Sequence, residues 1–199
     1  MSKILILFAH PAFQKSFSNQ VLVEGINKIN GITFHDLYEE YPEFDIDVER
    51  EKELLSHHDC IIFHHPFFWY STPAILKEWQ DLVLEHGWAF GTGGDKLQGK
   101  LFFNTITVGG PKEAYTRDGM QNNTIRELIA PLKQTAVFCN MVPLPPFVVY
   151  GTHAIEKEEL QAYKNSYHRL LRNIVDDKID IKKMNTHESL LEYINGEEN

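Results

Sequence analysis

Hydrophobic residues follow two alternating spacings along this chain of 199 residues. Nearly continuous apolar runs predict strands that are buried on both faces. Apolar residues spaced three and four apart predict helices with one buried side. The predicted strands cover residues 3–9, 32–36, 60–64, 101–108 and 142–150, and the predicted helices cover 19–29, 47–56, 73–84, 124–137 and 156–175.

Several residues mark where these elements begin and end. Ser16 and Ser18 are candidate N-caps of the first helix, and Asp47 is a candidate N-cap of the second. Gly31 is expected to stop the first helix, and Pro131 is expected to kink the helix over 124–137. Prolines also interrupt the last predicted strand.

Strands that alternate with helices predict an α/β fold, in which helices cover both faces of a parallel sheet. Five strands in about 175 residues fit a flavodoxin-like sheet with strand order 2-1-3-4-5. We expect one domain over residues 1–176. The charged tail over 177–199 is expected to be partly disordered or to form a short helix near 189–194.

The composition narrows the possible partners and location. The formal net charge is −9, which argues against binding to nucleic acid. Much of this charge lies in residues 36–53, where nine acids and two bases give −7. Two cysteines, Cys60 and Cys139, are too few for a disulfide framework. Without a recognisable signal peptide or membrane span, a cytoplasmic location is expected.

Ligands of such sheets bind beyond the carboxyl ends of the strands, and three predicted loops lie there. In the first loop, hydroxyls at a helix start could bind a phosphate, and His10 could donate a proton. The same serines could simply cap the helix, and their spacing by itself favours capping. The residues of this loop that could bind a ligand are His10, Ser16, Phe17, Ser18 and Asn19.

The second loop holds four successive aromatic residues, Phe67, Phe68, Trp69 and Tyr70. They could form a hydrophobic cluster or line the face of a flat aromatic ligand. The third loop, Thr107-Val108-Gly109-Gly110, has paired glycines that allow a close backbone approach to a ligand, or simply a turn.

Three segments of the chain together resemble a known family. Their order and position resemble the flavodoxin-like NAD(P)H:quinone oxidoreductases, from Lys3 to about Val175. The resemblance is strongest to the short bacterial branch that includes the ancillary flavoproteins of glutathione-gated potassium efflux systems. The segments are Pro66-x-x-Trp69-Tyr70-Ser71-x-Pro73-x-x-Leu76-Lys77-x-Trp79, His86-Gly87-Trp88-Ala89-Phe90-Gly91, and Thr107-Val108-Gly109-Gly110.

The resemblance implies that residues 1–176 form a flavin-binding domain, with FMN, or alternatively FAD, as cofactor and NAD(P)H as reductant. Residues 10 and 16–19 would hold the phosphate and ribityl chain, 67–70 would line the isoalloxazine, and 107–110 would contact its pyrimidine end. Hydride would pass to the flavin, and a quinone would then take two electrons in a ping-pong sequence. A homodimer is also implied, with Trp88 and Phe90 near the partner's flavin.

Tyr115 matches the family's active-site tyrosine and is the candidate catalytic residue. The longer enzymes have a histidine six residues beyond this tyrosine, where this chain has Gln121. A tyrosine–histidine proton relay is therefore not expected in that form.

Other functions remain open at this point. The ten histidines lack a metal-binding spacing, so no metal site is expected. The chain could instead be a regulatory flavoprotein that binds a potassium efflux transporter, with secondary reductase activity and a location peripheral to the inner membrane face. A flavodoxin-type electron carrier is a further alternative.

Overall fold

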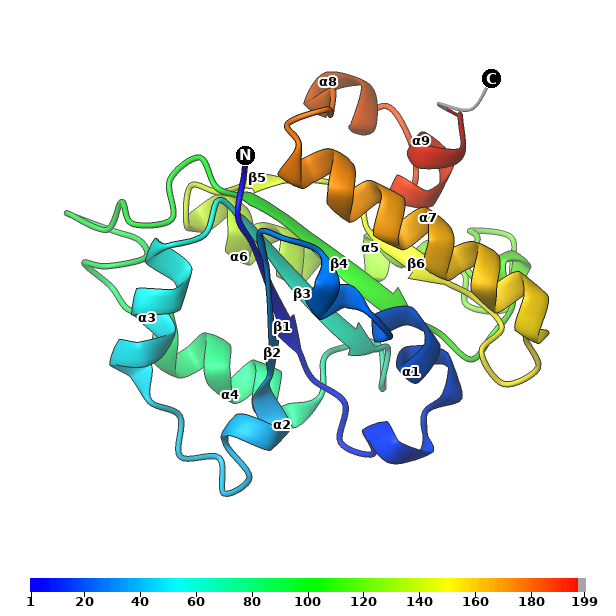
Figure 1. Ribbon diagram of the computed structural model, residues 1–199, viewed down its shortest axis with the longest axis horizontal. Helices are drawn as coiled ribbons and strands as arrows, with labels where there is room; N and C mark the ends of the chain where they lie inside the picture. The colour runs from blue at the N-terminus through cyan, green and yellow to red at the C-terminus, as the bar shows by residue number, and fades with distance from the viewer. Residues whose placement is uncertain (197–199) are drawn as a thin grey trace.

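The computed structural model describes residues 1–196 and consists of a twisted parallel sheet between two layers of helices (Figure 1). The strand order β2-β1-β3-β4-β5 confirms the predicted flavodoxin-like α/β fold. A further short strand, β6, also pairs with β4, and all pairings are parallel. The strands are β1 (Ile4–Phe8), β2 (Ile32–Asp36), β3 (Cys60–Pro66), β4 (Leu101–Thr107), β5 (Val142–Pro143) and β6 (Phe147–Val149).

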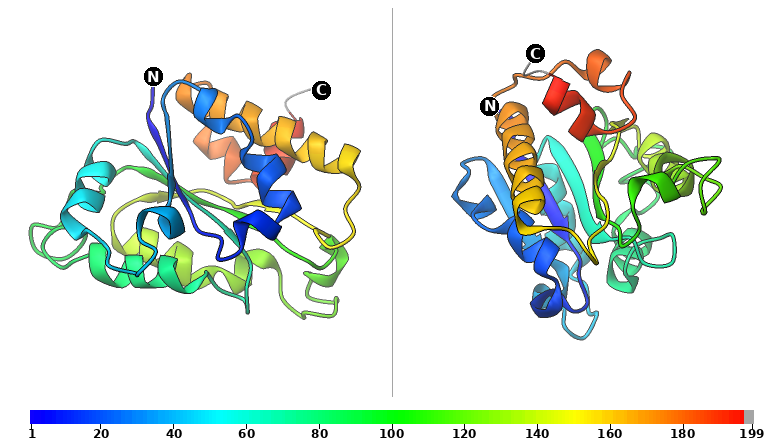
Figure 2. Two further views of the ribbon diagram at one scale, coloured as in Figure 1. Left: turned by 60° about the horizontal axis from the view of Figure 1, so that its bottom comes forward. Right: turned by 90° about the vertical axis from the view of Figure 1, so that its right-hand side faces the viewer.

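The two helical layers cover opposite faces of the sheet (Figure 2). One layer contains α1 (Phe17–Val23), α7 (Lys157–Val175), α8 (Ile181–Met184) and α9 (Leu190–Gly196). The other contains α2 (Leu37–Glu40), α3 (Val48–Ser56), α4 (Ala74–Val83), α5 (Ile125–Leu128) and α6 (Ala130–Phe138). Short 3₁₀ turns, η1 (Phe13–Lys15), η2 (Ile26–Lys28) and η3 (Lys112–Ala114), lie in the connections.

Side chains of β1 alternate between the two cores. Ile4 and Ile6 pack with the α1 and α7 layer, whereas Leu5 and Leu7 pack with the α3 and α4 layer. Because successive strand residues point to opposite faces, a strand covered on both sides must be apolar throughout. This requirement explains the continuous apolar run in the sequence.

The predicted N-caps Ser16 and Asp47 are confirmed, whereas Ser18, the other candidate, lies inside α1. The Asp47 carboxylate accepts from the N–H of Arg50 at 3.1 Å. The Ser16 hydroxyl accepts from the N–H of Asn19 at 3.4 Å and so begins α1. The prediction that the first helix continues to residue 29 and is stopped by Gly31 is wrong, because Gly25 adopts a left-handed conformation with φ of 82° and the chain turns there.

Two proline-containing regions also differ from their predictions. The strand predicted over 142–150 is two short strands, β5 and β6, separated by Leu144-Pro145-Pro146. Prolines have no N–H to donate to a strand ladder, so pairing with β4 is interrupted there. The helix predicted over 124–137 is also two helices. Pro131 lies in the first turn of α6, where its missing N–H is tolerated, and it does not kink one continuous helix.

The predicted charged tail is folded over its described part. Residues 181–184 and 190–196 form α8 and α9, and Met184, Leu190, Tyr193 and Ile194 are buried in the core beside α7. The short helix expected near 189–194 corresponds to α9. Residues 197–199 lie outside the described part of the chain, and the division at residue 176 stays a prediction.

Candidate functional site

Three loops leave the sheet side by side at the carboxyl ends of β1, β3 and β4. Ala9 donates its N–H to the His64 carbonyl at 3.0 Å, and Phe67 donates to the Thr107 carbonyl at 2.9 Å. Val108 donates in turn to the Val149 carbonyl at 2.9 Å, which adds the loop after β6 to the group. The strand registers therefore bring together segments that are far apart in the sequence (Figure 1).

Asn19 connects these loops below the surface. Its amide nitrogen donates to the Ser16 hydroxyl at 2.9 Å and to the Thr107 hydroxyl at 3.1 Å. Its amide oxygen lies 3.1 Å from Nε2 of His64. The Asn19 side chain is 1% exposed, so it holds Ser16 and Thr107 in place and offers a ligand little direct contact. Ser18 beside it is also buried.

His64 is a neutral donor to this arrangement. Complete burial lowers the pKa of His64 to about 3, because a charged imidazole is poorly solvated there. The Tyr167 hydroxyl, 3.4 Å from Nδ1, donates to that nitrogen, which leaves the proton on Nε2 for the Asn19 oxygen. His64 on β3 and Tyr167 on α7 thus determine which atoms of this hydrogen-bond network donate and which accept.

His10 lies at the start of the first loop and is nearly buried. Its Nδ1 accepts from the N–H of Ala12 at 3.1 Å, so the ring proton lies on Nε2. Burial lowers the pKa of His10, which favours the neutral ring. Its ring meets Phe68 edge to face, with 5.9 Å between centroids. A neutral N–H donor therefore lies between the first loop and the aromatic loop.

The aromatic loop holds its rings at the surface in a strained backbone. Trp69 is 93% exposed, and Phe68 and Tyr70 are also exposed. Trp69 and Tyr70 have φ values of 48° and 62°, which side-chain-bearing residues rarely adopt. The Thr72 hydroxyl oxygen nearby is buried without a hydrogen-bond partner among residues 1–196. Exposed rings, positive φ and an unpaired hydroxyl are features typical of a ligand site.

The glycine pair lies against side chains from other loops. A Cβ at Gly109 would lie 2.3 Å from Nε2 of His153, and one at Gly110 would lie 3.1 Å from the Tyr115 ring. His153 was missed by sequence reasoning, because its proximity depends on the long-range pairing of β4 with β6. Its position just after the last predicted strand, at the same edge of the sheet, was the only available signal.

Tyr115 lies between two other aromatic rings. Its centroid is 6.4 Å from that of Phe67 and 6.0 Å from that of Tyr150. Burial raises the pKa of Tyr115, so its hydroxyl remains protonated near neutral pH and can donate a hydrogen bond. Gln121 also reaches the site, where its Oε1 accepts from the Tyr70 hydroxyl at 2.9 Å.

The C-terminal segment extends to the back of this region. A cavity of about 270 Å³ beside Tyr115 is lined on its other side by Glu188, Ser189 and Glu192. Lys112, at the start of the turn that leads to Tyr115, pairs with Glu192 at 2.9 Å. The contact between Lys112 and Glu192 was not predicted from the sequence, in which residues 177–199 are interpreted as a charged tail.

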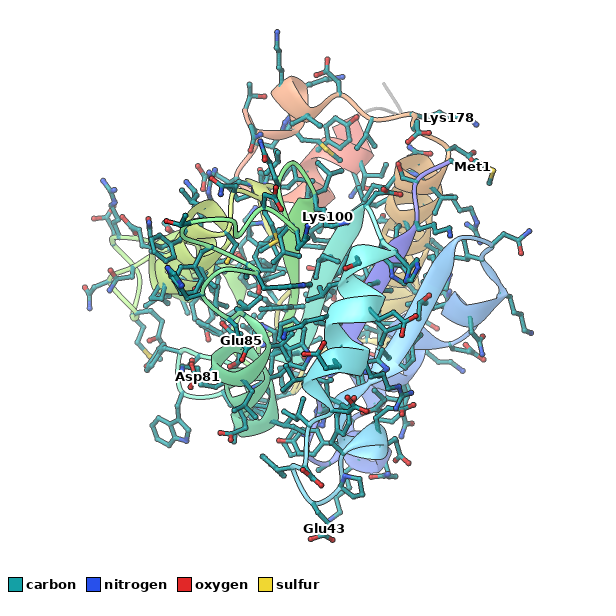
Figure 3. The ribbon with its side chains drawn as sticks, turned by 90° about the vertical axis from the view of Figure 1, so that its left-hand side faces the viewer. Met1, Glu43, Asp81, Glu85, Lys100 and Lys178 are labelled. Carbon is teal, nitrogen blue, oxygen red and sulfur yellow. The ribbon has the colours of Figure 1, made fainter. Side chains whose placement is uncertain are left out.

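Trp88 and Phe90 are not brought to the three loops. They follow α4, which runs back from the carboxyl edge towards the amino ends of the strands. Figure 3 looks onto that side, where Glu85 and Lys100 are labelled. Lys52 lies over the Trp88 ring at 5.9 Å, and the Phe90 ring lies 4.8 Å from that of Phe138.

Three further features bear on the chemistry. Across residues 1–196 no three side chains of the metal-binding types are grouped to hold an ion. Cys60 is buried as predicted for a core residue, and burial raises the pKa of its thiol. Within the same range, no helix combines the length and apolar character needed to cross a bilayer.

A family profile described as the flavodoxin-like fold matches residues 2–171. The uncharacterized NAD(P)H oxidoreductase YrkL of Bacillus subtilis (strain 168) is 46% identical over 169 residues, which cover 85% of this chain and 95% of YrkL. The glutathione-regulated potassium-efflux system ancillary protein KefG of Enterobacter sp. (strain 638) is 40% identical over 166 residues, which cover 83% of this chain and 91% of KefG.

Solved structures of similar proteins also have this fold. The general stress protein 14 of Treponema denticola, solved in complex with FMN, superposes with a TM-score of 0.81 at 32% identity, over 85% of this chain and 97% of that one. An NADPH-quinone reductase from P. pentosaceus superposes with a TM-score of 0.78 at 30% identity, over 84% and 96% of the two chains. The chain therefore belongs to the flavodoxin-like NAD(P)H:quinone oxidoreductase family.

Proposed function

We propose that this protein is an FMN-dependent NAD(P)H:quinone oxidoreductase. The observation that carries the proposal is the strained, exposed aromatic loop at 67–70, which lies beside the glycine pair Gly109-Gly110 and the protonated Tyr115. Exposed rings on a fixed loop suit a planar cofactor and planar substrates better than they suit a folded core. The FMN complex of a relative supports the choice of FMN over FAD.

Each loop has a distinct part in this proposal. The neutral Nε2–H of His10, together with Ser16 and the backbone at 17–19, would receive the phosphate and ribityl chain. The loop at 67–70 would line the ring system, and the buried Thr72 hydroxyl would gain a partner. The backbone at 107–110 would meet the pyrimidine edge, because glycine permits a close approach.

Bound at this site, FMN supplies the redox chemistry that carries two electrons from NAD(P)H to a quinone-like acceptor in two half-reactions. The aromatic loop at 67–70 would position the reacting rings against each other. Tyr115 would donate a hydrogen bond to an acceptor oxygen as negative charge develops there. Its raised pKa keeps that donor available near neutral pH.

Mass spectrometry of the released chromophore tests the cofactor directly, and a mass of FMN is expected. A colourless protein that takes up no added flavin would refute the proposal. The Tyr115→Phe variant tests the donor, and we expect slower quinone reduction with unchanged FMN affinity. Unchanged turnover with several quinones would exclude this role for Tyr115.

We also propose a homodimer, which the resemblance to the family implies. Trp88 and Phe90 both follow α4 and contact Lys52 and Phe138 instead of the three loops, so they could lie over a flavin only in a partner molecule. A dimer in sedimentation analysis, with slower quinone reduction in Trp88→Ala at unchanged oligomeric state, is the expected result. A fully active monomer would contradict it.

A second candidate function is that of a regulatory subunit of a potassium efflux transporter, with secondary reductase activity. The 40% identity with the KefG ancillary protein favours it. The protein would then be cytoplasmic and peripheral to the inner face of the membrane. Co-expression with the transporter of a glutathione-regulated potassium-efflux system should increase efflux, and unchanged efflux would count against this function.

A further inference from the structure

A second cavity lies away from the three loops, between α5, α6 and the segment that joins β5 to β6. Its volume is about 550 Å³, which is within the range that small-molecule sites occupy. Phe102, Ile129 and Leu144 form buried apolar walls. None of the loop residues at 10–19, 67–70 or 107–110 lines this cavity.

A buried amide interrupts the apolar lining. Asn104 lines the cavity and is only 4% exposed. Its Oδ1 lies 3.5 Å from Nε2 of His65, and the rest of its amide has no hydrogen bond to the described residues. Because the Asn104 amide keeps unused hydrogen-bonding capacity on the cavity wall, a bound polar group would be favoured here.

The charges on the cavity lining favour an anion. The Glu127 carboxylate is paired with Arg117 at 2.7 Å, and Arg126 donates to the His187 carbonyl at 3.1 Å. Lys133 also lines the cavity, is exposed, and has no ion pair within residues 1–196. The ammonium group of Lys133 is therefore available to an anion, and the Glu127 carboxylate on the same lining is already paired with Arg117.

We propose that this cavity binds a small aromatic carboxylate that carries a hydroxyl or carbonyl group. The ring would pack on Phe102, Ile129 and Leu144, the polar substituent would bond to Asn104, and the carboxylate would pair with Lys133. The proposal does not depend on the reductase function, because the cavity shares none of its lining with the flavin loops.

The site is connected to the aromatic loop by one buried side chain. Nδ1 of His65 lies 2.9 Å from the carbonyl of Pro66, the residue that precedes Phe67. Burial lowers the pKa of His65, so the ring is neutral and Nδ1 donates to this carbonyl. Nε2 is then an acceptor, and it bonds to Asn104 when the amide nitrogen is turned towards it, which leaves the amide oxygen for the cavity. A ligand that bonds to Asn104 would thus contact a network that ends at the base of the aromatic loop.

The probe for this site is 1-hydroxy-2-naphthoate, titrated into the FMN-saturated protein with methyl NMR as the readout. We expect shifts at Ile129, Val142 and Leu144, and at least about fivefold weaker binding in Lys133→Met because one charge pair is lost. Lys157→Met, at an exposed position on α7, is the matched control and should bind as the wild type does.

Trp69→Ala separates this site from the flavin site, because a planar probe could also stack on the aromatic loop. Binding that is lost in Trp69→Ala but unchanged in Lys133→Met would overturn the proposal. Absence of shifts at Ile129 and Leu144 up to millimolar probe would also overturn it, including the case in which a second protomer covers the cavity.

Discussion

Two regions of the molecule differ in whether their polar and aromatic groups are buried and hydrogen-bonded. On the buried side of α3, the Glu51 carboxylate is 0% exposed and accepts hydrogen bonds from three buried partners. His35 lies at 2.7 Å, Tyr41 at 2.5 Å and the Trp79 indole at 2.7 Å. In the aromatic loop, by contrast, the Trp69 ring is exposed and the Thr72 hydroxyl has no partner among the described residues.

The contrast shows which region contributes stability and which is available to a ligand. A buried carboxylate with a complete set of donors fixes the packing of β2, α2 and α4 around it. Exposed rings on a strained backbone contribute little to that packing, and their unused surface can be covered by a bound molecule. Substitutions around Glu51 should therefore affect the free energy of unfolding, whereas substitutions in the aromatic loop should affect ligand binding.

The largest expected effect on stability is that of Glu51→Ala. Removing this acceptor leaves three buried donors unpaired, which should lower the free energy of unfolding by about 3–5 kcal/mol. Urea denaturation measures this loss, and Glu49→Ala, at an exposed position on the same helix, should change it by less than about 0.5 kcal/mol. A loss below about 1 kcal/mol would show that the hydrogen bonds of Glu51 contribute little to stability, contrary to the comparison with the aromatic loop.

Asn19→Ala should lower both the stability of the fold and the affinity for FMN, because the buried hydrogen bonds of Asn19 hold the loops of the surface site in place. Loss of the bonds to Ser16 and Thr107 should cost about 1–3 kcal/mol and weaken FMN binding at least about fivefold. Flavin fluorescence titration measures the affinity, and Gln161→Ala, which loses only an exposed bond on α7, is the control. Full FMN affinity in Asn19→Ala would show that the loops hold their positions without it.

The pH dependence of stability should identify Glu51 as well. Burial by itself would raise the pKa of Glu51, but hydrogen bonds from His35, Tyr41 and Trp79 together lower it below 4.5. Its stabilising contribution is therefore complete above about pH 4.5 and is lost as the pH falls through the lower pKa of the folded state.

In that acidic range, this group adds up to about 1.4 kcal/mol per pH unit to the slope of the unfolding free energy. Denaturation curves for Glu51→Gln should lack this contribution. Equal slopes for the variant and the wild type below pH 4.5 would exclude it.

The smallest expected effect on stability is that of Trp69→Ala. Because this ring is almost wholly exposed, the free energy of unfolding should change by less than about 0.5 kcal/mol. The KM for a quinone should nevertheless rise about two- to tenfold, as expected from a stacking contact of about 0.5–1.5 kcal/mol. A large loss of stability with an unchanged KM would reverse the assignment of the two regions.

The sequence predicts the sheet well because parallel strands covered on both faces leave continuous apolar runs, as in β1 and β3. It also places the three loops correctly, since the order of the strands determines which ends meet. The split between β5 and β6 was harder to predict, because Leu144 still donates its N–H to the Phe102 carbonyl although Pro145 and Pro146 after it have no N–H to donate.

Other features depend on long-range contacts that no local pattern reports. The acidic segment suggests a solvated surface, yet Glu51 within it is buried by partners from β2 and α4. His153 meets Gly109 only because β6 pairs with β4. The buried side chains of α9 were obscured by the charges around them, although their spacing is helical.

The packing of α9 also has a consequence for folding during synthesis. The layer that covers Ile4 and Ile6 is completed by Leu190, Tyr193 and Ile194, and Ser2 bonds to the Val175 carbonyl at 3.0 Å. Strands made early therefore lack part of their cover until almost two hundred residues have been translated. During that interval the nascent chain exposes apolar surface, which makes it a candidate for chaperone binding on the ribosome.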